Sequence, residues 1–246
     1  MTRRQHGFTL VEIAIVLVII GLLLGGILKG QELINSARVR NIADTNSGIQ
    51  AAYFGFIDRY RAVPGDMTKA AAEAAIGQDM NSGGNNNGRL DAVDGNNLVE
   101  AAALWEHLWK AGFIQGSYDG TAKVLTDYPG VAPKNPFNGS IILYRTSDYR
   151  DNKPATPSVR LNLMLGQNIP ASIARELDVK VDDARPLTGV LRLAPKTAAT
   201  FTTLASADDD CIDFTAGEKP GDPPSAYGNE YDIKKDHQDC PVVFLY

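Results

Sequence analysis

The chain has 246 residues, with 24 Lys and Arg against 29 Asp and Glu, so its formal net charge is −5. A negative chain offers no broad basic surface for phosphate contacts, which argues against nucleic-acid binding driven by charge. Hydrophobic residues make up 44% of the sequence, which is too much for a wholly disordered chain. These residues are concentrated near the N-terminus, which predicts that the N-terminal segment has a different environment from the rest of the chain.

An apolar stretch spans residues 8–28 and contains a single charged residue, Glu12. At about 1.5 Å per residue, a helix of this length reaches about 32 Å, against about 30 Å for the hydrocarbon core of a membrane. The segment before it carries Arg3 and Arg4, and basic residues favour the cytoplasmic side. We therefore expect residues 8–28 to span a membrane and the following chain to be exported.

Glu12 is unusual for a membrane-spanning helix. An ionised carboxylate in hydrocarbon costs about 2–4 kcal/mol and is usually retained for a partner. We expect a cation beside Glu12, and a free α-amino group is the nearest candidate. A secretory signal has a shorter apolar region and a small-residue cleavage site, which this stretch lacks. An uncleaved signal anchor is the remaining alternative.

Residues 7–12 read GFTLVE and lead into the apolar run. This motif resembles the processing signature of type IV pilins and of the pseudopilins of type II secretion. The resemblance implies that a prepilin peptidase cuts between Gly7 and Phe8 and methylates the new N-terminus. It also implies that Glu12 pairs with the N-terminal amine of a neighbouring subunit. The chain would then polymerise with other pilin subunits on an assembly platform that has its own ATPase.

The apolar pattern continues beyond the predicted span. Apolar residues spaced by 7, 4, 3 and 4 predict that the helix continues with one face on a globular domain. They are Ile42, Ile49, Tyr53, Phe56 and Tyr60. Pro64 and Gly65 predict the end of the helix. The chain is therefore divided into a leader, a spanning helix, its amphipathic continuation and a globular head, at residues 1–7, 8–28, 29–60 and 61–246.

Two helices are predicted at the start of the head. Asp66 predicts the N-cap of a helix over about residues 67–76, and Asn97 with Glu100 matches a capping box for a second helix. Gly112 predicts where the second helix ends. The broad apolar face of that helix predicts that its two tryptophans belong to the core.

Beyond residue 120, four short runs rich in β-branched and aromatic residues are separated by Pro, Gly, Asn and Asp. They read SIILYRT, SVRLNLML, TGVLRLA and PVVFLY. A small antiparallel sheet fits this pattern, so the predicted class is α+β, with a long N-terminal α-helix packed on a C-terminal head of short helices and a small sheet. The pilin resemblance implies the same arrangement.

A loop rich in Asp, Asn and Gly lies between the two predicted head helices. Oxygen ligands at alternate positions around a glycine turn suit calcium, and Gly83 begins a possible twelve-residue frame. Asp79 lies before this frame and could fold back onto the ion. The candidate ligands are therefore Asp79, Asn85, Asn87, Asp91 and Asp94. The frame has Gly where Asp is usual and Asp where Glu is usual, so a plain solvated loop is the competing interpretation. No other cofactor is expected.

Cys211 and Cys240 are the only two cysteines, and both lie in the part of the chain expected to be exported. An oxidising exterior permits a disulfide, and closing a loop of about 30 residues stabilises by about 3–4 kcal/mol in the chain-entropy model. The intervening stretch has little apolar content. We expect a Cys211–Cys240 disulfide, with free thiols or a metal site as alternatives. Pilins often carry a disulfide-bound C-terminal loop, which the pair resembles.

The sequence contains no recognisable catalytic motif. The histidines are His6, His107 and His237, and none lies beside a nucleophile motif. GxSxG, HExxH and P-loop patterns are absent. We interpret His107 as a half-buried helix residue and the acidic pair 182–183 as an exposed turn. The chain is therefore not expected to be an enzyme.

The favoured function is a subunit of a type IV pilus or pilus-like filament, with its head exposed for adhesion, motility or uptake. The precursor is expected in a bacterial inner membrane, and the processed chain in an extracellular or periplasm-spanning filament. A pseudopilin or minor pilin of a type II secretion system is the first alternative. A membrane-tethered binding module, which needs neither cleavage nor Glu12, is the second.

Overall fold

The structure is a computed structural model of the chain. It describes residues 9–91, 98–121, 128–151, 157–194, 211–213, 230–235 and 237–246. The chain forms two compact units, residues 1–40 and 41–246. The first helix, α1, belongs to both units.

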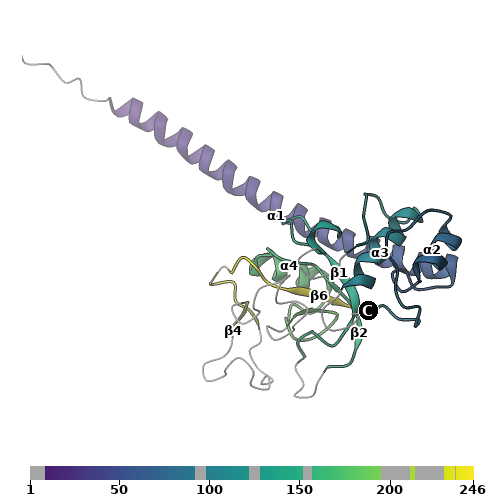
Figure 1. The fold of residues 1–246 in the computed structure, drawn as a ribbon. Helices are drawn as coiled ribbons and strands as arrows, with labels where there is room; N and C mark the ends of the chain where they lie inside the picture. The colour runs from purple at the N-terminus through teal and green to yellow at the C-terminus, as the bar shows by residue number, and fades with distance from the viewer. Residues whose placement is uncertain are drawn as a thin grey trace, which may run out of the picture. The chain divides into compact units, whose positions relative to one another are not determined.

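Helix α1 runs without interruption over Leu10–Tyr60, which confirms the long N-terminal helix predicted from the apolar pattern (Figure 1). In the second unit, four of the five predicted face positions are buried and Tyr60 is half-buried. The ring of Tyr60 still packs on Phe56, with centroids 4.6 Å apart. The upper end of α1 therefore supplies one wall of the core of the head.

Helix α2 spans Lys69–Ile76 and is shorter at its start than predicted. The predicted cap at Asp66 is wrong, because Thr68 is the N-cap and its hydroxyl accepts the Ala71 N–H at 3.3 Å. Gly77 ends the helix in the left-handed conformation, with φ of 77°, as its place in the sequence suggests. The carboxylate of Asp66 is buried and binds a loop instead of capping α2.

Helix α3 spans Val99–Lys110, and Gly112 follows it with φ of 79°. The predicted capping box is wrong at Glu100, whose carboxylate accepts N–H groups from a distant loop. Leu98 is the N-cap and makes no side-chain hydrogen bond. The other predicted member, Asn97, lies outside the described residues.

Helix α3 lies at the centre of the core of the head. Trp105 is fully buried, and its indole N–H donates to the Tyr128 hydroxyl at 2.7 Å. That hydroxyl in turn donates to the Ile141 carbonyl at 3.0 Å. The core prediction is thus confirmed for Trp105, whereas Trp109 is half-buried.

His107 is fully buried, so the half-buried prediction is wrong. Its Nδ1 accepts the Gly65 N–H at 3.0 Å, and its ring stacks on Phe56 with centroids 6.4 Å apart. Gly65 has φ of 88°, and a Cβ there would lie 2.4 Å from the Glu100 carbonyl oxygen. Only glycine therefore lets the chain leaving α1 approach α3 this closely. Burial lowers the pKa of His107, which keeps the ring neutral.

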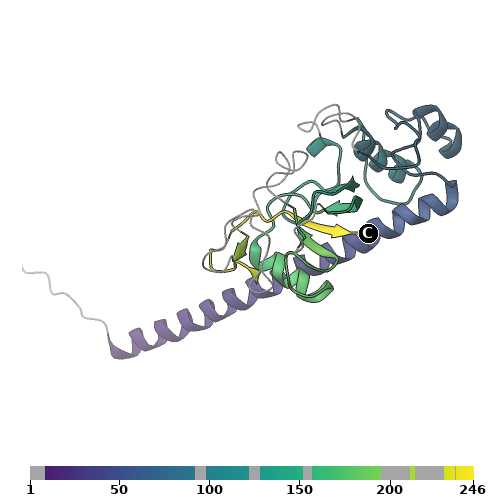
Figure 2. The ribbon, with the colours of Figure 1, turned by 90° about the horizontal axis from the view of Figure 1, so that it is seen from below.

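Four strands form one antiparallel sheet in the order β1-β2-β6-β3. They span Ile142–Thr146, Arg160–Met164, Val242–Leu245 and, for β3, Leu191–Leu193. Each strand lies inside one of the four predicted runs, so the predicted sheet is confirmed. The hydroxyl of Tyr246, just after β6, hydrogen-bonds Asn46 Oδ1 on α1, and Figure 2 marks this C-terminus beside the helix.

Helix α4, at Ala171–Val181, was not predicted, and neither was the two-stranded sheet of β4, Ile212–Asp213, and β5, Glu230–Tyr231. A 3₁₀ turn, η1, spans Tyr128–Gly130. The buried face of α4 includes Ile173, Ala174 and Leu177. Helix α4 packs on β5, which places the small sheet next to its last turn.

Candidate functional site

The first half of α1 presents apolar side chains over its whole circumference. Residues 9–29 are all exposed, and the large apolar side chains among them range from 46% exposed at Ile20 to 85% at Leu10. Among the described residues, α1 is the one helix with the length and composition to cross a membrane. An exposed apolar surface of this extent marks a membrane or protein contact.

Glu12 lies in the first turn of α1 and is exposed. Its Oε2 accepts the backbone N–H of Thr9 at 2.8 Å and the Thr9 hydroxyl at 2.9 Å. No ion pair within the described part of the chain includes Glu12. The lone carboxylate of the apolar segment is thus held by its own turn. Gly7 and Phe8, the predicted processing residues, lie outside the described residues.

The Cys211–Cys240 disulfide is present, which confirms the predicted pairing. The two Cα atoms are 5.8 Å apart, and both side chains are fully buried. Cys240 follows the small sheet and precedes β6, and its N–H donates to the Ile169 carbonyl at 2.7 Å. The crosslink therefore ties the start of β4 to the main sheet.

Residues 2–28 match the family model of the prokaryotic N-terminal methylation motif. The matched segment contains Gly7, Phe8, Glu12 and the exposed apolar turns of α1. The chain carries the hallmark motif of type IV pilins and pseudopilins. No curated protein and no solved structure matches the chain. The motif and the apolar helix together fit a membrane-anchored, pilin-like precursor, and the head has to be interpreted from its own contacts.

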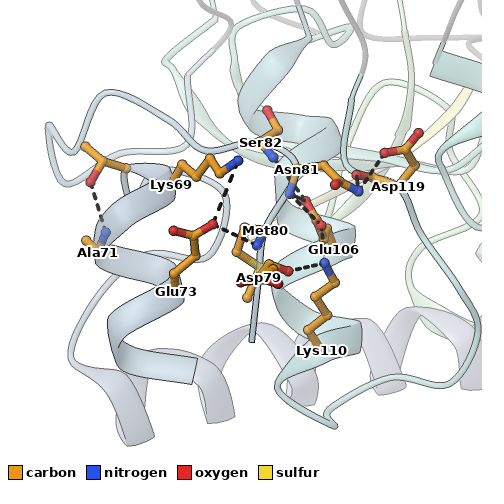
Figure 3. Close-up of polar contacts among 11 residues, drawn as sticks. Lys69, Ala71, Glu73, Asp79, Met80, Asn81, Ser82, Glu106, Lys110 and Asp119 are labelled. Carbon is orange, nitrogen blue, oxygen red and sulfur yellow. Dashed lines mark hydrogen bonds and ion pairs between the residues drawn. The ribbon is translucent and has the colours of Figure 1, made fainter. Parts of the chain in front are cut away.

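Buried acids hold the loop of residues 80–91, which we call the anchored loop. Glu106 on α3 is fully buried, and its Oε1 accepts the Asn81 N–H at 2.9 Å (Figure 3). Its Oε2 accepts the Ser82 N–H at 3.3 Å. Lys110, one turn further along α3, contacts Oε1 at 2.6 Å. Glu106 thus binds the start of the anchored loop from inside the head.

Asp66 and Glu100 hold the rest of the anchored loop in the same way. The two carboxylate oxygens of Asp66 accept the N–H groups of Asn87 at 2.9 Å and Gly88 at 2.8 Å. Those of Glu100 accept two further loop N–H groups, at 3.2 and 2.8 Å. Burial raises the pKa of Glu100, and the two loop N–H groups oppose that rise. The loop backbone thus takes the place of the cations that buried acids usually need.

Two of the candidate calcium ligands, Asp79 and Asp91, contact different residues of α3. The backbone carbonyl of Asp79 accepts from the Lys110 ammonium, at the end of α3. Asp91 donates its N–H to Glu100, at the start of α3. The Lys110 ammonium also contacts Glu106 Oε1 at 2.6 Å. Asp79 is therefore held near Glu106 and Asp91 at Glu100, and Asp94 lies outside the described residues.

Asn85, Asn87 and Asp91 lie together in one turn of the anchored loop. The Asn85 Oδ1 accepts the Asn87 N–H at 3.0 Å, and the Asn87 Oδ1 accepts the Arg89 N–H at 2.9 Å. The Asn87 side-chain amide donates to Asp91 Oδ2 at 3.3 Å. These are the local side-chain contacts typical of Asn-rich turns. The oxygens that were predicted to face an ion are used within the loop itself.

Calcium binding by Asn85, Asn87 and Asp91 stays a prediction, and thermal melting tests it. Calcium at 100 times its dissociation constant would stabilise the head by about 2.7 kcal/mol, which corresponds to a midpoint rise of about 5–10 °C. The midpoint is measured for the full chain in detergent with calcium and with EDTA. Asp91→Asn should abolish the rise, and equal midpoints for the unmodified chain would remove calcium from the account.

The residues that hold the anchored loop were missed by sequence reasoning. Asp66 was assigned to a cap, Glu100 to a capping box, and Glu106 to no role. Positions 100–108 of α3 are all buried, so acids on this helix are buried whichever way they point. The available signal was Glu106 directly beside Trp105, because an acid next to a core tryptophan requires internal donors when it is buried.

Proposed function

We propose that the chain is a subunit of a type IV pilus or pilus-like filament. A prepilin peptidase would cut between Gly7 and Phe8, and residues 8–28 would carry polymerisation while the head stays exposed. The observation that carries the proposal is the fully exposed apolar half of α1 with a single carboxylate, Glu12, inside a matched methylation motif. Adhesion, motility or uptake would then be tasks of the head.

Glu12 is proposed to select the position of the next subunit. A carboxylate in an apolar packing environment is costly and is usually paired with a cation. Processing would create a free α-amino group on Phe8, four residues before Glu12 in the chain. Pairing between Glu12 of one subunit and the amine of its neighbour satisfies both charges and fixes their axial offset. The assembly platform, its ATPase and the inner membrane are the other partners of this proposal.

A pseudopilin or minor pilin of a type II secretion system is the alternative within the same family. Such a protein would be processed in the same way and would use the same helix as a pilus subunit. It would differ from a pilus subunit in how much filament is assembled and in where that filament lies. A membrane-tethered binding module is the alternative outside the family. It predicts an uncleaved chain that tolerates loss of Glu12. We further propose a structural and not a catalytic role for the chain.

Filament assembly should depend on Glu12 while membrane insertion does not. Removing one partner of a buried ion pair costs about 3–5 kcal/mol, so Glu12→Ala should lower the yield of sheared filaments at least about tenfold. The variant should still be inserted and cleaved. Filament yield is measured in the sheared fraction and normalised to the processed chain in the membrane.

Glu32→Ala is the matched control for this experiment. Glu32 is also an acid of α1, but it is exposed beyond the apolar segment and pairs with Lys29 at 2.7 Å. Its loss should leave the yield near that of the unmodified chain. A normal yield from Glu12→Ala would contradict the filament proposal, and uncleaved Glu12→Ala would show that the residue acts in processing.

A further inference from the structure

Asp178, in the last turn of α4, is a fully buried acid outside the anchored loop. The hydroxyl of Tyr231 on β5 donates to its Oδ2 at 2.9 Å. The backbone N–H of Ala184 donates to its Oδ1 at 3.3 Å. One buried carboxyl group thus connects α4 to the small sheet of β4 and β5.

Two more acids follow Asp178 in the turn after α4. Asp178, Asp182 and Asp183 each place a carboxylate oxygen within 4.8 Å of the other two. Asp182 accepts the Leu191 N–H at 3.2 Å, and Asp183 accepts the Arg185 N–H at 3.0 Å. No ion pair found in the described ranges includes any of the three acids. Ionising all three would place like charges side by side next to a buried contact.

Asp178 therefore responds to pH in a range where ordinary aspartates do not. Burial, opposed by the Tyr231 hydrogen bond, raises the pKa of Asp178 to about 7, and the charges of Asp183 and Asp182 add to the rise. The titratable groups that face it are Tyr231 from β5, and Asp182 and Asp183 from the turn. Because its folded pKa is raised, Asp178 contributes stability that is fully present below about pH 4 and is lost as the pH rises through about 7.

The contact of Asp178 with Tyr231 also bears on the disulfide. Tyr231 pairs with Ile212 across the small sheet, next to Cys211. The N–H of Asp232 donates to the Cys211 carbonyl at 2.9 Å. If Tyr231 separates from α4, we therefore expect Ile212 and Cys211 to move with it.

We propose that Asp178 and Tyr231 form a latch that holds the small sheet of β4 and β5 on α4 while the Asp178 carboxyl group is neutral and loosens when that group becomes charged. The hydrogen bonds from Tyr231 and Ala184 favour the charged carboxylate, but burial and the negative charges of Asp183 and Asp182 outweigh them, so the closed contact favours the neutral group. The charged group adds a third negative charge to the cluster. The covalent crosslink limits the movement, so the latch controls local opening and leaves the rest of the head folded. This device is independent of filament assembly.

Hydrogen exchange of the full chain in detergent tests the latch. Exchange is followed by mass spectrometry at pH 6.0 and 8.5 and corrected for intrinsic rates, with EDTA present so that no bound metal ion bridges the acids. If the open form has an ordinary Asp pKa of about 3.9, the opening constant should rise about tenfold between these pH values. The rise is expected in peptides from the end of α4 and from residues 230–235, and not in peptides from α3.

Three variants separate the latch from a general loss of stability. Asp178→Asn keeps an acceptor for Tyr231 and should remove the pH dependence. Tyr231→Phe should increase opening already at pH 6.0. Asp213→Asn, which removes an exposed acid of the same small sheet that pairs with Lys234, should behave like the unmodified chain. Equal opening of the unmodified chain at both pH values, or a pH dependence that survives Asp178→Asn, would overturn the proposal. If Asp178→Asn fails to fold, the comparison of the unmodified chain at the two pH values decides the test.

Discussion

Replacing Glu106 with alanine is expected to lower the free energy of unfolding of the head by about 3–5 kcal/mol. The fully buried carboxylate accepts two backbone N–H groups of the anchored loop and pairs with Lys110, whose side chain is only 13% exposed. Its removal leaves a mostly buried ammonium group and two N–H groups without their acceptor. The loss exceeds that of a surface ion pair because water cannot take the place of the carboxylate.

The chain contains a matched control for Glu106. Glu176 and Lys180 on α4 form an ion pair with the same spacing of four residues and the same 2.6 Å distance, but their side chains are 38% and 37% exposed. Glu176→Ala should therefore cost no more than about 1 kcal/mol. Urea unfolding of the full chain in detergent, followed by tryptophan fluorescence, measures both losses, because both tryptophans lie on α3. Equal losses for the two variants would contradict the anchoring role of Glu106.

Loss of the disulfide is the second large effect expected. The bond joins residues separated by 29 positions, and a loop of this length stabilises by about 3–4 kcal/mol in the chain-entropy model. The double variant Cys211→Ala/Cys240→Ala should lower the free energy of unfolding by this amount. Because Cys240 also anchors the chain next to β6, peptides from β4 and β5 should lose more exchange protection than those from α3.

The disulfide prediction is checked by urea unfolding of the double variant against the unmodified chain. The unmodified chain under reducing conditions serves as a control that breaks the disulfide without replacing a residue. Its loss should match that of the double variant within about 1 kcal/mol. A loss below about 1 kcal/mol in both would show that the crosslink contributes little and that contacts around Cys240 hold this end of the chain.

Regular elements of the chain were largely readable from local patterns. The apolar spacing that ends at Tyr60 predicted α1, and short β-prone runs such as PVVFLY predicted every strand of the main sheet. Each of these patterns lies within one continuous segment, so the element can be predicted from that segment alone. Helix α4 was missed although Ile173, Ala174 and Leu177 have the spacing of a buried helix face.

The polar interior was not readable in the same way. Asp66 has the residue type and position of a helix cap, yet its carboxylate binds Asn87, 21 residues further along the chain. His107 is buried because the turn at Gly65 supplies an N–H donor to it. Such contacts join segments that only the tertiary fold brings together, and residue type alone does not indicate which partner a carboxylate or an imidazole will find.

The central claim is that this pilin-like chain is processed and assembled into a filament through α1. The most direct test is the intact mass of the protein in a sheared extracellular fraction and in the inner-membrane fraction of its native cells. We expect abundant chain that begins at methylated Phe8 in the sheared fraction. Processed chain confined to the membrane fraction would favour a pseudopilin or minor pilin. Chain that begins at Met1 or Thr2 in both fractions would contradict the account.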